Sequence, residues 1–178
     1  MTGTLRPPVS ATDHRLGAAA DARVVVTAFG DYECPYSRRL DRLVREELVD
    51  AHAGEVAYVF RHFPLEKIHL RALDAALAAE AAGAQGRFWD MHALLYDNQR
   101  DLDRSELAGF AERLNLDVKR FTRDLDERVY VDRVRGDLRS GVGSGVQSTP
   151  TAFLNGQRWE LQRVDEIVLD VEHALRAQ

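Results

Sequence analysis

The strongest constraint on the fold is a change of hydrophobic period near residue 30. Residues 24–29 form a β-branched run that ends at Gly30-Asp31, which is typical of a strand buried on both faces. From Pro35 the apolar residues recur at helical spacing, and residues 55–63 return to a strand pattern that Pro64 closes. A strand, a helix and a strand within about forty residues form a βαβ unit with parallel strands. The sequence therefore predicts an α/β protein.

The middle of the chain, at about residues 66–140, predicts an inserted all-helical block. Asp103, followed by Glu106, is expected to cap one helix of this block. Asp117 is expected to cap the next helix, which would carry Phe121, Leu125 and Val129 on its apolar face. A glycine-rich stretch at residues 140–145 predicts the end of the block.

After the helical block the hydrophobic period returns to two. Residues 151–154 and 157–160 predict two strands joined by a hairpin turn at Asn155-Gly156. Residues 165–175 then predict a last helix. The predicted order is β-α-β, a helical block and β-β-α, around a central mixed sheet.

Length and composition fit one soluble domain. The chain has 178 residues, of which 45% are hydrophobic and 30% are charged, so we expect a packed core in a domain at 23–178, preceded by an N-terminal arm at 1–22. The net charge of −5, with both signs interspersed, argues against nucleic-acid binding. The sequence shows neither a signal peptide nor an apolar stretch long enough for membrane insertion, so we expect a cytoplasmic location and assign no oligomeric state.

The chain has one cysteine, Cys34, which excludes an internal disulfide and any zinc site built on paired cysteines. Cys34 directly precedes Pro35 and the predicted helix, where the unpaired N–H groups and the helix dipole favour the reactive thiolate. The basic residues Arg38, Arg39 and Arg42 follow on the same helix. The alternative is a buried structural cysteine, but the charged neighbour Glu33 argues against burial. The six histidines show no metal-ligand spacing, so we expect no metal site.

A second candidate site lies at Ser148-Thr149-Pro150-Thr151, directly before the strand predicted at 151–154. A proline at the start of a strand marks an edge or a special backbone geometry. A cis bond between Thr149 and Pro150 would offer the Thr149 backbone N–H and C=O to an extended peptide.

Three stretches of the sequence resemble the DsbA-like branch of the thioredoxin superfamily: 29–37, 61–65 and 148–156. The lead-in at 7–17 also resembles thioredoxin-like domains that are fused to some Na⁺/H⁺ antiporters. The resemblance implies a thioredoxin fold with a helical insertion, in which the loop before a cis-proline faces the active-site cysteine.

Residue by residue, the resemblance makes Cys34 the attacking cysteine and puts Ser37 in the place of the second, resolving cysteine. Both are therefore candidate catalytic residues. Pro35, Tyr36, Thr149 and Pro150 match positions that contact the substrate.

The serine at position 37 limits the chemistry, because a resolving thiolate normally releases the mixed disulfide. We therefore expect a monothiol oxidoreductase that exchanges or isomerises disulfides of proteins and peptides. Glutathione is a possible co-substrate, and no other cofactor is expected. Two alternatives stay open: an enzyme similar to kappa-type glutathione transferases, in which Ser37 or Cys34 activates glutathione, and a redox-inactive module that binds a peptide or partner. Ser37 is also compatible with a deliberate replacement of the second cysteine.

Overall fold

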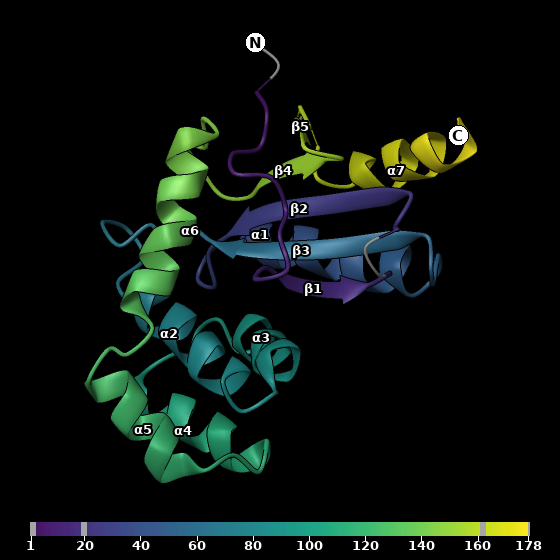
Figure 1. Cartoon of the computed structure of the whole chain (residues 1–178). Coiled ribbons are helices and arrows are strands. Elements are labelled where there is room, and N and C mark those ends of the chain that lie inside the picture. The colour runs from purple at the N-terminus through teal and green to yellow at the C-terminus, as the bar shows by residue number, and fades with distance from the viewer. Residues whose placement is uncertain (1–2, 19–20, 161–162, 178) are drawn as a thin grey trace. The chain divides into compact units, whose positions relative to one another are not determined.

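The structure is a computed structural model that describes residues 3–18, 21–160 and 163–177 (Figure 1). The chain forms two compact units. The first, here called the sheet unit, comprises Met1–Gly30, Tyr36–Arg61 and Arg139–Gln178. The second, here called the helical unit, comprises Asp31–Pro35 and His62–Leu138.

Within the described residues, five strands form one sheet in the order β1-β3-β2-β4-β5. The strands are β1 (His14–Gly17), β2 (Val24–Gly30), β3 (Val56–His62), β4 (Thr151–Leu154) and β5 (Gln157–Arg158). Strand β1 pairs with β3, β4 with β2, and β5 with β4, each time antiparallel, whereas β2 and β3 run in the same direction (Figure 1). The predicted βαβ unit and the predicted mixed sheet are thus confirmed.

The hairpin between β4 and β5 shows how its turn residues set the strand pairing. Asn155 and Gly156 both have positive φ, at 47° and 78°, as a two-residue hairpin turn of this type requires. The second strand is shorter than predicted, since it ends at Arg158. A hydrogen bond from the Trp159 amide to the Ala152 carbonyl continues the contact by one residue.

Helix α1 (Pro35–Arg42) begins at the predicted residue and continues into η1 (Leu43–Val49). This second segment is π-helical, with a hydrogen bond from the Asp50 amide to the Arg45 carbonyl. The helical spacing predicts an apolar face of Leu40, Leu43, Val44 and Leu48. Leu40, Val44 and Leu48 are buried, whereas Leu43 is half-buried. Helix α7 (Glu166–Arg176) contacts η1 and β2 through its own buried face.

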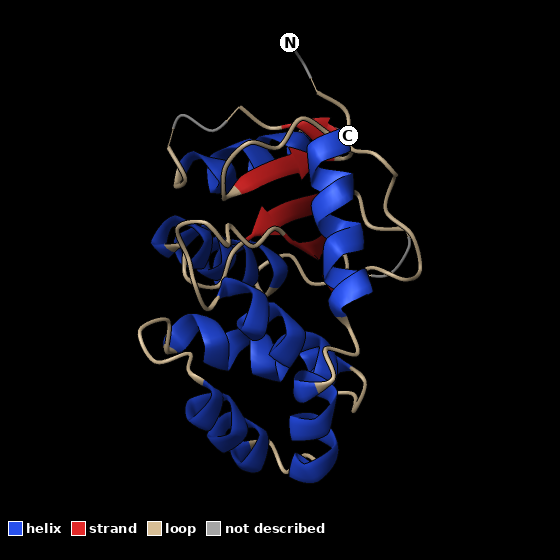
Figure 2. Ribbon diagram, turned by 90° about the vertical axis from the view of Figure 1, so that its left-hand side faces the viewer, coloured by secondary structure: helices blue, strands red, loops and turns tan. Residues whose placement is uncertain are grey.

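The middle of the chain is helical, as predicted (Figure 2). It contains α2 (Ala72–Gly83), α3 (Phe88–Asp97), α4 (Arg104–Arg113), α5 (Val118–Asp126) and α6 (Val131–Gly143). Helix α2 is rich in alanine and is buried almost along its whole length, so its neighbours α3, α4 and α5 approach it closely. Among the described residues, no helix has the length and apolar character needed to cross a bilayer.

One local prediction in the helical block is wrong. Val129 lies beyond α5 and is 51% exposed, because the chain turns at Arg128, which has a positive φ of 51°. The prediction that the glycine-rich stretch at 140–145 ends the block is confirmed, since α6 ends within it at Gly143. Gly145, with φ of 78°, provides the turn that follows.

Contacts with Arg6 in the N-terminal segment explain why α6 continues to Gly143, inside the glycine-rich stretch. The hydroxyls of Ser140 and Ser144 donate to the Arg6 carbonyl at 2.9 and 3.1 Å, and the Arg6 amide donates to the Ser144 hydroxyl at 2.7 Å. Tertiary contacts of this kind override the helix-breaking tendency of glycine. The segment predicted as an arm at 1–22 also contributes β1 to the sheet and a bridge from Thr4 to Gln157.

The predicted caps of α4 and α5 are confirmed, and the cap of α4 leads to a pH-dependent prediction. The Asp103 carboxylate accepts hydrogen bonds from the amides of Ser105 and Glu106, and from the Ser105 hydroxyl at 2.6 Å. The Ser105 hydroxyl first, and then the Glu106 amide, lower the pKa of Asp103 below its ordinary value. The Asp103 carboxylate therefore stabilises the fold above the pKa that Asp103 has in the unfolded chain. This contribution is lost as the pH falls through the pKa that Asp103 has in the folded protein.

We expect Asp103→Ala to lower the melting temperature by a few degrees at neutral pH, because the cap is lost. The difference between this variant and the wild-type protein should shrink as the solution becomes acidic. Asp103→Asn is the matched control, since its amide oxygen keeps an acceptor at the cap but does not titrate in this range. Thermal melts of the three proteins from neutral to acidic pH test this. A difference between wild type and Asp103→Ala that stays constant with pH would contradict the prediction.

Candidate functional site

Cys34 lies in a tight turn that leads directly into α1. Its amide donates to the Asp31 carbonyl at 3.1 Å, and the residue is only 5% exposed. The expectation that charged Glu33 would keep Cys34 at the surface is wrong. The Glu33 carboxylate accepts a hydrogen bond from the Arg71 amide at 2.6 Å. The carboxylate therefore has a polar partner, although the next residue, Cys34, is buried.

Asp31 fixes the turn to the loop that follows β3. Its carboxylate is buried and accepts hydrogen bonds from the Glu33 amide at 2.8 Å and the Leu65 amide at 2.7 Å. The same carboxylate lies 2.9 Å from Nδ1 of His69. A buried carboxylate with three partners is a strong structural anchor, because breaking any of these contacts leaves a desolvated polar group.

Tyr32 anchors the turn to helix α3. Its hydroxyl lies 2.8 Å from Nδ1 of His92 in a buried contact, and its ring packs against Tyr96 with centroids 4.9 Å apart. Phe88 and Trp89 complete this aromatic cluster on α3 through their contacts with His92. Edge and tilted contacts of this kind fix ring positions as well as burying area.

Gln99, which follows α3, contacts the backbone of Cys34 through its side chain. Its side-chain Nε2 donates to the carbonyls of Tyr32 at 2.6 Å and Cys34 at 3.0 Å. Sequence reasoning did not identify Gln99. A single glutamine 65 residues from Cys34 carries no local pattern that would indicate this contact.

The other predicted residues of the cysteine motif have contrasting environments. Pro35 and Tyr36 are exposed, Tyr36 by 65%, whereas Ser37 is 2% exposed on the first turn of α1. Two of the following arginines have carboxylate partners: Arg39 bonds Asp165 at 2.6 Å, and Arg42 bonds Glu46 at 2.9 Å. These ion pairs reduce the positive charge that the sequence alone attributed to this helix.

The predicted cis bond between Thr149 and Pro150 is confirmed. Pro150 is buried and Thr149 is half-buried directly before β4. The Thr151 hydroxyl donates to the Ser148 carbonyl at 2.8 Å and closes the loop on itself. Of the predicted site residues, Cys34 and Pro35 belong to the helical unit, and Tyr36, Ser37, Thr149 and Pro150 belong to the sheet unit.

The helical unit also contains a buried cluster of charged groups. Nε2 of His62 lies 2.9 Å from the Glu80 carboxylate, and Arg133 donates to Asp137 at 2.7 Å. Asp137 also accepts from the His62 amide at 3.0 Å. Burial raises the pKa of Asp137 above its ordinary value, and the nearby charges of His62 and Arg133 offset part of this effect. These contacts pair buried charged groups within the helical unit.

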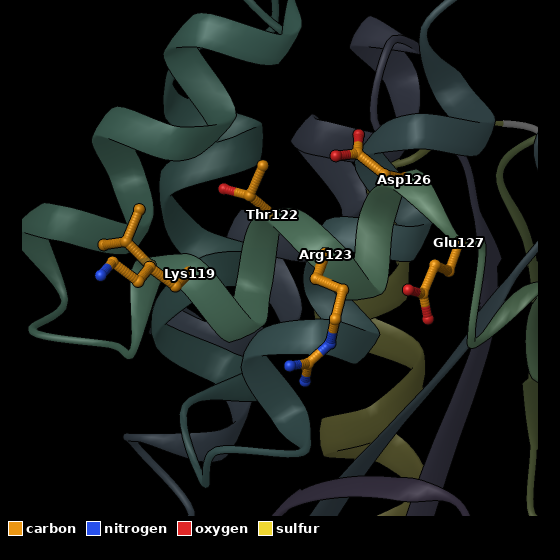
Figure 3. A pocket seen from close by; sticks show the side chains of 6 residues that line it. Lys119, Thr122, Arg123, Asp126 and Glu127 are labelled. Carbon is orange, nitrogen blue, oxygen red and sulfur yellow. The ribbon is translucent and has the colours of Figure 1, made fainter.

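A surface hollow along α5 is lined by none of the predicted site residues (Figure 3). Its side chains alternate in charge, and Asp126 is also paired with Arg104. Mixed charge on an exposed helix face gives no consistent preference for a ligand of either sign. The lining residues are Val118, Lys119, Thr122, Arg123, Asp126 and Glu127.

In the thioredoxin fold the reactive cysteine precedes the first core helix, and a cis-proline precedes the strand that enters the hairpin. This chain keeps both positions and carries inserted helices, which makes it a thioredoxin-fold protein of DsbA-like type. The family model described as Thioredoxin matches residues 10–171, and the chain belongs to this family.

Solved structures agree with the fold. Oxidised BdbD from Bacillus subtilis has a TM-score of 0.81 at 23% identity, and covers 99% of this chain and 98% of its own. The α-DsbA1 protein of Wolbachia pipientis has a TM-score of 0.78 at 18% identity, over 95% of this chain and 94% of its own.

The sequence relatives are named as Na(+)/H(+) antiporters, unlike the similar solved structures. The protein named Na(+)/H(+) antiporter NhaA 1 from Salinispora arenicola is 43% identical over 154 residues, which are 86% of this chain and 23% of that protein. The chain therefore spans about a quarter of the length of such relatives and resembles a domain within them.

Proposed function

We propose that the protein is a thiol-disulfide oxidoreductase that acts through Cys34 as a monothiol. The observation that carries this proposal is the position of Cys34 directly before α1 in a DsbA-like thioredoxin fold, with Ser37 in place of a second cysteine. A thiolate at a helix N-terminus is favoured by the unpaired amides and the helix dipole.

The proposed reaction has two balanced exchange steps. The Cys34 thiolate attacks one sulfur of a disulfide, a new S–S bond forms to Cys34, and the other sulfur leaves as a thiolate. An external thiolate, such as that of glutathione, then attacks the mixed disulfide and releases Cys34 in its original form. Because Ser37 carries no sulfur, the second step requires this external thiol.

The remaining residues receive their roles from the resemblance to the DsbA-like branch. We propose that Pro35, Tyr36, Thr149 and Pro150 contact the polypeptide substrate and that the Ser37 hydroxyl donates a hydrogen bond to the Cys34 thiolate. The expected cytoplasmic location stays a prediction. The antiporter names of the relatives favour a place of action beside a membrane.

The test is the reaction of the folded protein with oxidised glutathione, followed by intact mass. We expect one glutathionyl group on Cys34, and its removal by reduced glutathione. A Cys34→Ser variant is the control and should gain no mass. A folded wild-type protein that stays unmodified under conditions that modify the unfolded chain would contradict the proposal.

The burial of Cys34, at 5% exposure, favours one alternative function. In that alternative the protein is a redox-inactive module that binds an extended peptide at Thr149-Pro150 and does not turn over disulfides. Absence of glutathionylation, together with peptide binding that is unchanged in Cys34→Ser, would select this alternative.

A further inference from the structure

We infer that Gln99 is a positioning residue for Cys34, so that its side-chain amide controls the reactivity of the thiol. This inference rests on the proposed function only in treating Cys34 as the reacting group. The observation is the pair of hydrogen bonds from Nε2 of Gln99 to the carbonyls of Tyr32 and Cys34, at 2.6 and 3.0 Å.

The two hydrogen bonds use both N–H donors of the Gln99 side-chain amide. A glutamine side chain carries two N–H donors on one nitrogen, and here each donor has one carbonyl acceptor of the turn. Tyr32 lies three residues before the start of α1. Gln99 therefore binds the backbone of both Tyr32 and Cys34.

The end of helix α3 holds Gln99 in place. Helix α3 ends at Asp97, two residues before Gln99, and the Asn98 side chain donates to the Leu94 carbonyl at 2.7 Å and closes the last turn. The same helix holds the Tyr32 ring through His92 and Tyr96. The turn is thus fixed to α3 by its Tyr32 side chain and, through Gln99, by its backbone, which limits the directions that the Cys34 side chain can adopt.

The amide also acts electrostatically. The carbonyls of Tyr32 and Cys34 belong to the backbone that carries the thiol, and an N–H donor compensates the negative end of each carbonyl dipole. Without the donor the thiolate, which is itself negative, is disfavoured relative to the thiol. Gln99 therefore favours thiolate formation as well as a defined sulfur position.

Three variants test this inference by alkylation of Cys34 with iodoacetamide, a reaction that reads thiol reactivity whether or not the protein exchanges disulfides. Gln99→Met keeps the side-chain length and removes the donors. We expect its alkylation rate at neutral pH to fall by at least about fivefold, because two hydrogen bonds are lost and one typical net hydrogen bond corresponds to about that factor. We also expect the pH at which the rate is half its maximum to rise. Gln99→Glu should show a larger fall, because its carboxylate would face two carbonyl oxygens.

Gln85→Met is the matched control. The Gln85 side chain likewise bonds backbone groups across the helical unit, accepting from the Asp117 amide at 2.8 Å and donating to its carbonyl at 3.4 Å. We expect Gln85→Met to change the melting temperature without changing the alkylation rate or its pH profile. A folded Gln99→Met protein with an unchanged rate and profile would overturn the inference, as would an equal slowing in Gln85→Met. Failure of the wild-type protein to react with oxidised glutathione would instead contradict the proposed function.

Discussion

Ser37→Cys is expected to convert the protein into a dithiol enzyme with an internal disulfide. Position 37 lies on the first turn of α1, three residues after Cys34, and its side chain is buried. A second thiol at this spacing attacks the mixed disulfide on Cys34 and releases the substrate without an external thiol. We expect the rate at which the reduced protein converts a disulfide peptide to its dithiol form to rise by at least about tenfold, because resolution becomes intramolecular.

The measurement has three parts. Intact mass after treatment with an oxidant should show the loss of two hydrogens in Ser37→Cys, whereas the wild-type protein should carry an adduct. Ser37→Ala is the control for loss of the hydroxyl and should remain a monothiol protein. The combination of Cys34→Ser with Ser37→Cys should lose the gained activity. A folded Ser37→Cys protein whose two thiols both remain alkylatable after oxidation would refute the expectation.

The architecture was predictable because it depends on local patterns. The β-branched run at residues 24–29, the helical spacing after Pro35 and the turn at Asn155-Gly156 each specify an element over a few residues. The caps at Asp103 and Asp117 were predictable for the same reason, since a cap is set by the residues that follow it within one turn.

The contacts that hold the candidate site were not predictable, because they join distant parts of the chain. Asp31 bonds the loop near residue 65, and Gln99 bonds the backbone of Cys34, with no periodicity to mark either pair. The burial of Cys34 was mispredicted for a related reason. Glu33 suggested exposure, and only its long-range partner, the Arg71 amide, explains how the turn is buried.

Arg61, in the sheet unit, makes several such long-range contacts. Its side chain is 3% exposed and pairs with Asp13 through two hydrogen bonds, at 2.8 and 3.0 Å. The guanidinium also donates to the Ser140 hydroxyl at 2.8 Å and to the carbonyls of Pro7 and Pro8 at 2.9 and 3.1 Å. One side chain thus joins β3, the N-terminal segment and the end of α6.

We expect Arg61→Met to lower the free energy of unfolding by about 3–5 kcal/mol, because it leaves the buried Asp13 carboxylate and two carbonyls without their cationic donor. Urea denaturation, followed by circular dichroism, measures this loss. Arg61→Lys should recover little of it, since an ammonium group lacks the planar fork that bonds Asp13 at two points. The matched control is Arg42→Met, which removes an exposed ion pair with Glu46 and should cost less than about 1 kcal/mol.

Replacing both Arg61 and Asp13 separates the stabilisation that the ion pair gives from the cost of leaving the Asp13 carboxylate without Arg61. When Asp13→Leu is combined with Arg61→Met, no buried carboxylate is left without its cationic partner, and we expect the double variant to be more stable than Arg61→Met. It should remain less stable than wild type, because the Ser140 hydroxyl and the carbonyls of Pro7 and Pro8 still lack their donor. If Arg61→Met costs no more than Arg42→Met, the guanidinium does not hold the N-terminal segment to the sheet. A cost of the expected size in Arg61→Met, with partial recovery in the double variant, identifies the buried charge as the source of the loss.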